Sequence, residues 1–420
     1  MPDPMVEVLV QIGDEDVLAG RLWAHRRGLT ESATFRYAPE FIARRDAYEL
    51  DPLLPLVDGP LQTPLGRKIF GAFSDCAPDR WGRRLINREE THRVESSGGA
   101  ARSFGEIDYL LNVRDDLRQG ALRFRDPNTG TYVAREQDGV PYLLELPKLL
   151  HAAEHLERDE ATAEEVRTLL RGGSSLGGAR PKAHVINADG RIAIAKFPSP
   201  ANDEWDVMRW EAVALDLATR AGIATPTWNL HTIDGNAVLI VDRFDRTGQH
   251  RIGYVSAMTL LEATDGDRST YLDIADVIER YAPDATDDLR ELWRRIAFSI
   301  LISNTDDHLR NHGFLRTTTS GWSLSPAFDM NPDPRPGPKH LATAIESDPA
   351  ASVDLLIGVA DYFRLNEREA RTVLRDVADA TSNWQEVAKQ LGLDSDAIDT
   401  MTPAFEHEQA EVTRGLPAAG

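Results

Sequence analysis

The sequence has almost no cysteine, no excess of positive charge and no long apolar run. Its 420 residues include one cysteine, Cys76, so no disulfide can form within the chain and a cysteine-based zinc site is disfavoured. No stretch approaches the roughly 18 consecutive apolar residues of a membrane span. Acidic residues outnumber basic ones, 68 against 47, and the net charge is −21. Because such a chain repels phosphate backbones, direct binding to nucleic acid is disfavoured.

The first twenty residues also lack the basic segment of a secretory signal peptide. They carry acidic residues on both sides of a short apolar run. We therefore expect no signal peptide, no membrane association and a cytoplasmic location. The apolar fraction of 41% is typical of a globular protein. At roughly 100–200 residues per domain, the length predicts two to four domains or lobes.

The most informative stretch is residues 292–332, where an apolar helical segment runs into a polar cluster. Asp306 in that cluster and Asn311 are five residues apart. Protein kinases place their catalytic base and a magnesium-binding asparagine at this spacing. A strand-like run follows, and then an isolated acidic residue, Asp329. We therefore predict Asp306 as the base, and Asn311 and Asp329 as Mg²⁺ ligands.

Two neighbours of the predicted base need a separate interpretation. Asp307 lies only four residues before Asn311, so we interpret it as a neighbour of the base. We expect His308 to brace the same site by hydrogen bonding. An Asx-rich turn that caps a helix would explain the polar cluster by itself. It would not explain why a second acidic residue follows between apolar neighbours.

A glycine-rich stretch at 171–182 precedes a predicted β-hairpin. Glycines let backbone N–H groups approach an anion closely, although a flexible linker has the same composition. Lys196 ends the alternating apolar run of the second strand. A lysine on an apolar strand after a glycine loop matches the ATP-phosphate lysine of kinases. We therefore predict a nucleotide-phosphate site that contains Lys196.

The helix predicted over residues 203–222 carries an acidic residue on its apolar stripe. Glu211 shares that stripe with three apolar side chains, Val207, Ala214 and Ala218. A carboxylate that faces a protein core needs a partner, and Lys196 is the predicted one. The alternative is a surface glutamate at the edge of the stripe.

Residues 236–248 read as a buried strand that runs into a charged connector. In a two-lobed kinase this is the hinge, where backbone groups meet adenine. Asp242 and Phe244 would then line the nucleotide pocket. Alternatively, Arg243, Asp245 and Arg246 form a simple ion-paired turn.

Several of these motifs occur in an order that resembles the HipA family of serine/threonine kinases, the toxins of bacterial type II toxin–antitoxin pairs. In chain order the motifs are SSLGGARPK, AKFP, the Trp210-Glu211 helix, VDRFDR, NTDDHLRN and FDMNP. The segment LTESATFRYAPEF near the N-terminus and the later SFGEIDYLL are also similar to this family. The resemblance implies an α+β, two-lobed protein-kinase-like fold with three domains. These are an N-terminal mixed α/β subdomain (1–125), a kinase N-lobe (126–246) and a mainly helical C-lobe (247–420).

The resemblance also implies roles for single residues. Ser175 corresponds to the serine that such kinases autophosphorylate, whereas the residues alone leave Ser174 open as the acceptor. Asp306 would be the base, beside Lys196 and Glu211. The implied contacts to ATP and its magnesium are Gly177, Gly178, Ala179, Arg180, Lys182, Lys196, Asp242, Arg243, Phe244, His308, Asn311 and Asp329.

The implied cofactors are ATP and Mg²⁺, and the implied substrate is a protein hydroxyl. Aminoacyl-tRNA synthetases are a known substrate class of the family. A helix-turn-helix antitoxin is the expected partner, and DNA would be contacted only through it. Two other functions remain open on the sequence: a small-molecule kinase on a related scaffold, and a nucleotide-binding co-repressor subunit with little kinase activity.

Overall fold

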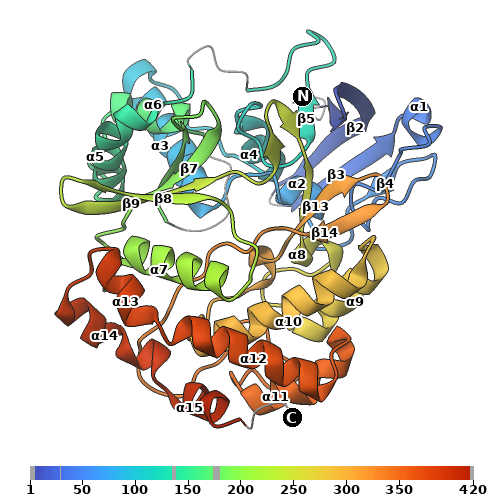
Figure 1. The fold of residues 1–420 in the computed structure, drawn as a ribbon. Coiled ribbons are helices and arrows are strands. Elements are labelled where there is room, and N and C mark those ends of the chain that lie inside the picture. The colour runs from blue at the N-terminus through green and yellow to red at the C-terminus, as the bar shows by residue number, and fades with distance from the viewer. Residues whose placement is uncertain (1–4, 29, 135–138, 174–179, 417–420) are drawn as a thin grey trace. The chain divides into compact units, whose positions relative to one another are not determined.

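The computed structural model describes residues 5–28, 30–134, 139–173 and 180–416. The chain divides into two compact units. The first comprises Met1–Asn202 and Ile233–Val255, and the second comprises Asp203–Thr232 and Ser256–Gly420. Helices and strands are both abundant, so the α+β class expected from the sequence is confirmed (Figure 1).

The N-terminal part of the first unit is built on an antiparallel sheet with strand order β4-β3-β2-β1-β5. Its strands are β1 (Met5–Ile12), β2 (Glu15–Arg27), β3 (Thr30–Tyr37), β4 (Leu61–Gln62) and β5 (Leu122–Arg125). The alternating apolar pattern of residues 5–40 therefore does form strands, as predicted. Edge-to-face contacts of Phe73 with Phe35 and Phe124 help to pack this sheet. The helices nearby are α1 (Pro39–Ile42), α2 (Gly71–Ser74), α3 (Arg80–Ser97) and α4 (Glu106–Asn112).

A second sheet of the first unit contains β6 (Lys182–Ile186), β7 (Ile192–Lys196) and β9 (Asn236–Asp242), with β7 between the other two. The predicted hairpin is β6–β7, and its register pairs Lys182 with Lys196. The turn places Gly190 at a φ of +76°, where glycine avoids the strain of a side chain.

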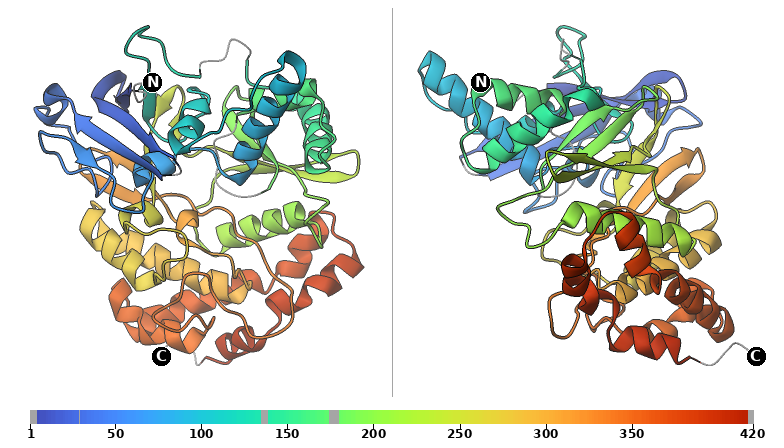
Figure 2. Two further views of the ribbon diagram at one scale, coloured as in Figure 1. Left: turned by 180° about the vertical axis from the view of Figure 1, so that it is seen from behind. Right: turned by 60° about the vertical axis from the view of Figure 1, so that its left-hand side comes forward.

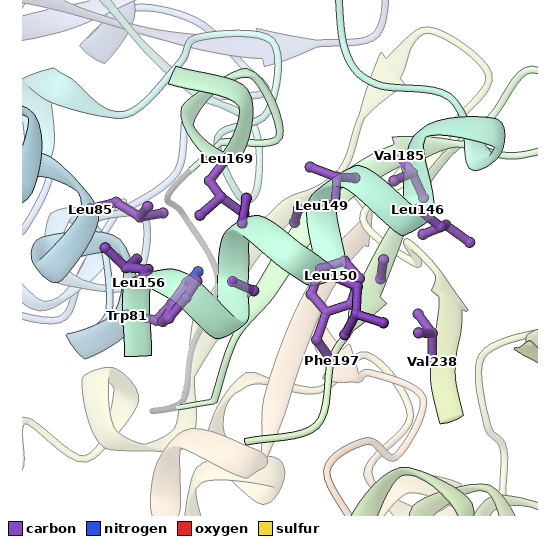
Figure 3. Close-up of a cluster of buried hydrophobic side chains, with 14 of the residues drawn as sticks. Trp81, Leu85, Leu146, Leu149, Leu150, Leu156, Leu169, Val185, Phe197 and Val238 are labelled. Carbon is purple, nitrogen blue, oxygen red and sulfur yellow. The ribbon is translucent and has the colours of Figure 1, made fainter. Parts of the chain in front are cut away.

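One face of this second sheet is covered by helices α5 (Leu146–Glu157), α6 (Ala163–Arg171) and α3 (Figure 2). Their apolar side chains form one buried cluster with alternate residues of the three strands. Figure 3 shows Trp81 of α3, Leu150 of α5, Leu169 of α6 and Val185 of β6 in this cluster. Because side chains alternate across a strand, Lys182 and Lys196 lie on the other face of the hairpin.

The second unit is mainly helical. Its longest helix is α10 (Ala285–Leu301), whose Leu289, Leu292 and Ile296 are fully buried, as the apolar period predicted. The other helices are α7 (Val207–Arg220), α8 (Ala257–Leu260), α9 (Tyr271–Tyr281), α11 (Val353–Gly358), α12 (Glu367–Thr381), α13 (Trp384–Gln390), α14 (Ser395–Phe405) and α15 (Glu408–Arg414). A hairpin of β13 (Gly313–Thr318) and β14 (Gly321–Leu324) follows the segment after α10. Of the helices in the described ranges, none is long and apolar enough to cross a membrane.

Candidate active site

The polar cluster begins where helix α10 ends. The helix stops at Leu301, and Ser303 takes a left-handed φ of +53°, which turns the chain away from the helix axis. The N–H of Asn304 then donates to the carbonyl of Ser299 at 2.8 Å. A non-glycine residue in this conformation is uncommon, and it fixes where the following residues emerge. The loop at 303–308 therefore leaves a buried helix at a defined point.

The two adjacent aspartates of this loop differ in burial. Asp306 is exposed, whereas Asp307 is buried. The Tyr271 hydroxyl donates to Asp307 Oδ2 at 2.5 Å, and His312 Nε2 lies 3.1 Å from Asp307 Oδ1. The carbonyl of Asp307 also accepts a hydrogen bond from the Thr343 hydroxyl. These contacts give Asp307 a structural role, and the assignment of Asp306 as the base stays a prediction.

The contacts of Asp307 determine whether its buried carboxyl group is protonated. Burial by itself would raise the pKa of Asp307, but the His312 charge and the hydrogen bonds from His312 and Tyr271 outweigh it. The pKa of Asp307 therefore lies below its ordinary value. Burial and the Asp307 charge both raise the pKa of Tyr271 well above its ordinary value. The phenol thus stays a donor and the carboxylate an acceptor.

Asn311 is held in an orientation suited to a metal ligand. It is buried, and its Nδ2 donates to the carbonyl of Asp306 at 3.1 Å. The N–H of Asn311 donates to the His308 carbonyl, and the N–H of His308 donates to the Asp306 carbonyl. The amide nitrogen is therefore engaged within the turn, and its oxygen is the atom left to coordinate a cation. His308 closes this turn through its backbone, and its half-buried ring has a buried Nδ1 without a hydrogen-bond partner in the described chain.

Asp329 lies in a loop that is hydrogen-bonded to the loop at 303–308. The N–H of Asn331 donates to Asn304 Oδ1 at 3.2 Å. The N–H of Asp333 donates to the Ser303 carbonyl, also at 3.2 Å. Asp329 itself takes a left-handed φ of +60°. Asn304 and Asn331 are 27 residues apart in the sequence, and the hydrogen bonds bring the two loops together within the second unit.

The oxygen ligands in these loops fit a magnesium ion. Among the residues that the structure describes, no three His, Cys, Asp or Glu side chains form a metal cluster. Magnesium does not need one, because it is commonly held by one or two carboxylates, waters and substrate phosphates. Beside Asp329, the Asn331 side chain donates to Asp329 Oδ1, while its own Oδ1 is buried without a hydrogen-bond partner in the described part of the chain. Asn311, Asp329 and this amide oxygen are hard oxygen donors of the kind Mg²⁺ prefers.

The predicted Lys196–Glu211 pair joins residues of different units. Lys196 ends β7 in the first unit and is half-buried. Glu211 lies in α7 of the second unit and is 2% exposed, so it does face the core as its position on the apolar stripe indicated. That burial disfavours a surface glutamate, and the ion pair with Lys196 stays a prediction.

The phosphate-loop residues are only partly described. Ser174, Ser175, Gly177, Gly178 and Ala179 lie outside the described residues. Arg180 is half-buried just before β6.

Lys182 is buried, and its Nζ donates to Asp79 Oδ2 at 2.8 Å. No local pattern in the sequence indicates this ion pair, because its two partners are about a hundred residues apart.

The predicted hinge contains a buried ion-paired turn. Both nitrogens of one edge of Arg243 bind the Asp245 carboxylate, at 2.8 and 2.6 Å. Arg243 Nη1 also donates to the carbonyl of Leu117 and lies 3.0 Å from His184 Nε2. Burial and the charge of Arg243 both lower the pKa of His184, so this imidazole is neutral. The ion-paired turn considered as an alternative is therefore present, and the guanidinium of Arg243 is engaged in it.

The other two predicted hinge residues flank this turn. Asp242 ends β9, where its carboxylate pairs with Arg191 at 2.9 Å and accepts from Asn187 Nδ2 at 3.0 Å. Phe244 is half-buried, with its ring centroid 6.4 Å from that of Tyr254. The structure describes these surroundings within the first unit, and the contact of residues 242–244 with adenine stays a prediction.

Comparison with known proteins places this geometry in context. A family model for the HipA-like C-terminal domain matches residues 174–384, just over half of the 420 residues. None of the curated proteins matches the sequence. The fold is similar to that of a solved HipA, HipB and operator DNA complex from Shewanella oneidensis MR-1. That likeness has a TM-score of 0.68 at 18% identity and covers 97% of this chain and 96% of the other.

A second similar structure is the proinflammatory kinase CtkA of Helicobacter pylori. It has a TM-score of 0.44 at 16% identity, over 57% of this chain and 91% of that one. The likeness to the Shewanella complex extends over nearly the whole chain, so it covers both units. The α+β, kinase-like fold expected from the sequence is thereby confirmed.

Proposed function

The chain belongs to the HipA family, and from this premise we propose that it is an ATP- and Mg²⁺-dependent protein serine/threonine kinase. The observation that carries the proposal is the division of labour between the two adjacent aspartates. Asp307 is buried and fully engaged, while Asp306 is exposed beside an asparagine held with its amide oxygen available. Phosphoryl transfer needs one carboxylate for the acceptor hydroxyl and oxygen ligands for the metal.

In the proposed reaction Asp306 accepts the proton of the acceptor serine or threonine hydroxyl. Asn311 and Asp329 would hold Mg²⁺, which neutralises charge on the ATP phosphates when bound. The hydrogen bonds from the N–H groups of Asn331 and Asp333 to Asn304 and Ser303 would help to hold the loop of Asp329 beside the loop of Asp306. Positioning and charge neutralisation are the main sources of catalysis in this chemistry.

The nucleotide would be bound chiefly by residues of the first unit. Lys196 and Lys182, paired across one hairpin, offer positive charge to the phosphates in a chain whose net charge is −21. Arg180 and the glycine loop at 177–179 would complete the phosphate site. The segment 242–244 would meet adenine through its backbone. We also propose that Ser175 is the autophosphorylation site and that its phosphorylation switches the kinase off, because a phosphoserine adds about −1.5 to −2 charge beside the ATP phosphates.

The expected partners follow from the family. The similar Shewanella protein was solved together with HipB and operator DNA. We propose that this chain likewise binds a helix-turn-helix antitoxin, and contacts DNA only through that partner. Its acidic net charge is consistent with such an indirect contact. The substrate would be a protein hydroxyl, with an aminoacyl-tRNA synthetase as one substrate class.

Incubation of the purified chain with ATP, with and without Mg²⁺, tests the proposed activity. Mass spectrometry should find one phosphate on the peptide 172–180 only when Mg²⁺ is present, and none in Asp306→Asn. Calorimetry with ATP separates the alternatives. Binding without any phosphate transfer would instead support the nucleotide-binding co-repressor, and phosphorylation of a small molecule alone would support the small-molecule kinase.

A further inference from the structure

The first turn of helix α3 contacts strand β6 at a residue of the proposed phosphate site. Asp79 immediately precedes α3 and caps it, since its Oδ1 accepts from the N–H of Gly82 at 2.7 Å. Its other oxygen accepts from Lys182 Nζ at 2.8 Å. Both side chains of this ion pair are nearly inaccessible, at 8% for Asp79 and 7% for Lys182. One carboxylate therefore fixes the start of a helix and the ammonium of a strand residue.

A second contact ties the same two elements through the backbone. The indole Nε1 of Trp81 donates to the carbonyl of Lys182 at 3.0 Å. Trp81 is 3% exposed and belongs to the apolar cluster that covers the sheet (Figure 3). Because the indole is locked in this cluster, its N–H is a rigid donor. Lys182 is thus held at its side chain by Asp79 and at its main chain by Trp81.

The charges on this hairpin explain why such a contact is needed. Lys182 and Lys196 are directly paired across β6 and β7, so their side chains start on the same face a few ångströms apart. Like charges in this arrangement repel each other, and one of them is buried. Asp79 supplies the opposite charge. Burial raises the pKa of Asp79. The positive charge of Lys182 opposes that rise, because it favours the ionised carboxylate.

We propose that Asp79 and Trp81 are positioning residues for nucleotide binding, which hold Lys182 where it meets the phosphates of ATP. This inference rests on the proposed function. It assigns a purpose to the stretch PDRWG, residues 78–82, which the sequence left without a role. It also makes the N-terminal part of the first unit a contributor to the phosphate site, through α3, although no residue of α3 is proposed to touch the nucleotide.

The test compares ATP with adenosine, which has no phosphates, by calorimetry on the full-length chain with Mg²⁺. Asp79→Asn removes the charge but keeps a good helix cap, since asparagine caps as well as aspartate. Because the variant loses a charge-assisted hydrogen bond, its ATP affinity should fall by roughly 10-fold to 100-fold. Its affinity for adenosine should be unchanged. In steady state, KM for ATP should rise by a similar factor while kcat stays near the wild-type value.

Three further variants separate positioning from folding. Lys182→Gln should lose as much ATP affinity as Asp79→Asn, and the double variant should lose no more than Lys182→Gln alone. Trp81→Phe removes only the N–H donor and should cause a smaller loss of ATP affinity. Asp394→Asn is the matched control, because Asp394 caps α14 by accepting from the N–H of Ala397 and should leave ATP binding unchanged.

The inference is overturned if Asp79→Asn binds ATP as tightly as the wild type or more tightly. Equal losses for ATP and adenosine, or additive losses in the double variant, would also overturn it. If Asp79→Asn does not fold, Trp81→Phe decides by the same two ligands, and an ATP affinity equal to that of the wild type would then overturn the inference. Suppose that the wild-type chain binds ATP and transfers phosphate, and that Asp79→Asn binds ATP with the same affinity. That result refutes only this inference. A wild-type chain that binds no ATP refutes the proposed function and the inference with it.

Discussion

The buried aspartates of the two units are stabilised by different kinds of partner. In the turn at 242–246 of the first unit, Asp245 binds two arginines, Arg243 and Arg246, and accepts from the N–H of Gly120. In the loop at 303–308 of the second unit, Asp307 is bound by the hydroxyl of Tyr271 and by His312. Burial alone would raise the pKa of either group, and in both cases the partners lower it below the ordinary value.

The difference lies in what each aspartate would leave behind if it were lost. Asp245 neutralises guanidinium groups that cannot give up their protons, so its removal leaves buried positive charge. Asp307 accepts from a neutral phenol and lies beside one imidazole, which, unlike a guanidinium, does not carry a permanent charge. Loss of the carboxylate should therefore destabilise the turn at 242–246 more than the loop at 303–308. Asp306, in contrast, is exposed, and its proposed role is in the chemistry.

The largest expected effect is on activity. Asp306→Asn should reduce phosphate transfer by about 10²–10⁴-fold, the usual contribution of a general base. Because Asp306 is exposed, the thermal midpoint of the Asp306→Asn variant should stay close to that of the wild type. Radiolabelled phosphate transfer and thermal unfolding of the same samples check both statements. An active Asp306→Asn together with a folded but inactive Asp307→Asn would reverse the assignment of the two aspartates.

The next largest effect is on stability, when the carboxylate of Asp245 between the two arginines is removed. Asp245→Asn should lower the free energy of unfolding by about 3–5 kcal/mol, because it leaves uncompensated buried charge. Urea unfolding measures this change. Asp189→Asn is the control, since Asp189 forms an exposed ion pair with Arg191 and should unfold like the wild type. Equal behaviour of the two variants would show that the turn does not depend on its buried charge.

A third buried carboxylate sharpens the comparison through pH. Asp51 is bound by two backbone N–H groups, of Leu53 and Ala72, and burial raises its pKa to about 6. Between its ordinary pKa and this value the folded chain holds a proton that the unfolded chain has released. Stability should therefore fall as the pH rises from about 4 to about 6, by at most about 3 kcal/mol from this group.

The variant Asp51→Asn lacks this titration. It should be less stable than the wild type at pH 4.5, because an amide cannot accept both hydrogen bonds as well, and the gap should narrow at pH 7.5. Urea unfolding at the two pH values checks the sign. A gap that widens toward neutral pH would mean that Asp51 is stabilised in its charged form, as Asp245 and Asp307 are.

The smallest effect on stability is expected in the loop at 303–308. Asp307→Asn should lower the free energy of unfolding by about 1–3 kcal/mol, since the hydrogen-bond donors around it are left imperfectly paired. Tyr271→Phe should cost less, and the two changes together should be less than additive, because they share one hydrogen bond. A double-mutant cycle by urea unfolding measures the coupling. A loss as large as that of Asp245→Asn would contradict the distinction between the two regions.

The elements and the order of motifs could be predicted from the sequence because they depend on local patterns. The strands within residues 5–40, the β6–β7 hairpin and the buried stripe of α10 follow from alternation and from the helical period. Spacing alone favours Asp306 over Asp307 as the base, and this choice stays a prediction; the structure shows only that Asp307 is buried. The domain boundaries at 125 and 246 stay predictions.

Other features depended on residues far apart in the chain. The sequence determined which residues form helices and strands, which polar cluster follows α10, and which motifs match the HipA family. Only the tertiary structure decided that Lys182 pairs with Asp79, that Arg243 is held by Asp245 and the Leu117 carbonyl, and that Tyr271 and His312 bind Asp307. The physical reason is that periodicity and spacing report on neighbours along the chain. A buried charge is satisfied by whichever group the packing of the core brings within hydrogen-bonding distance.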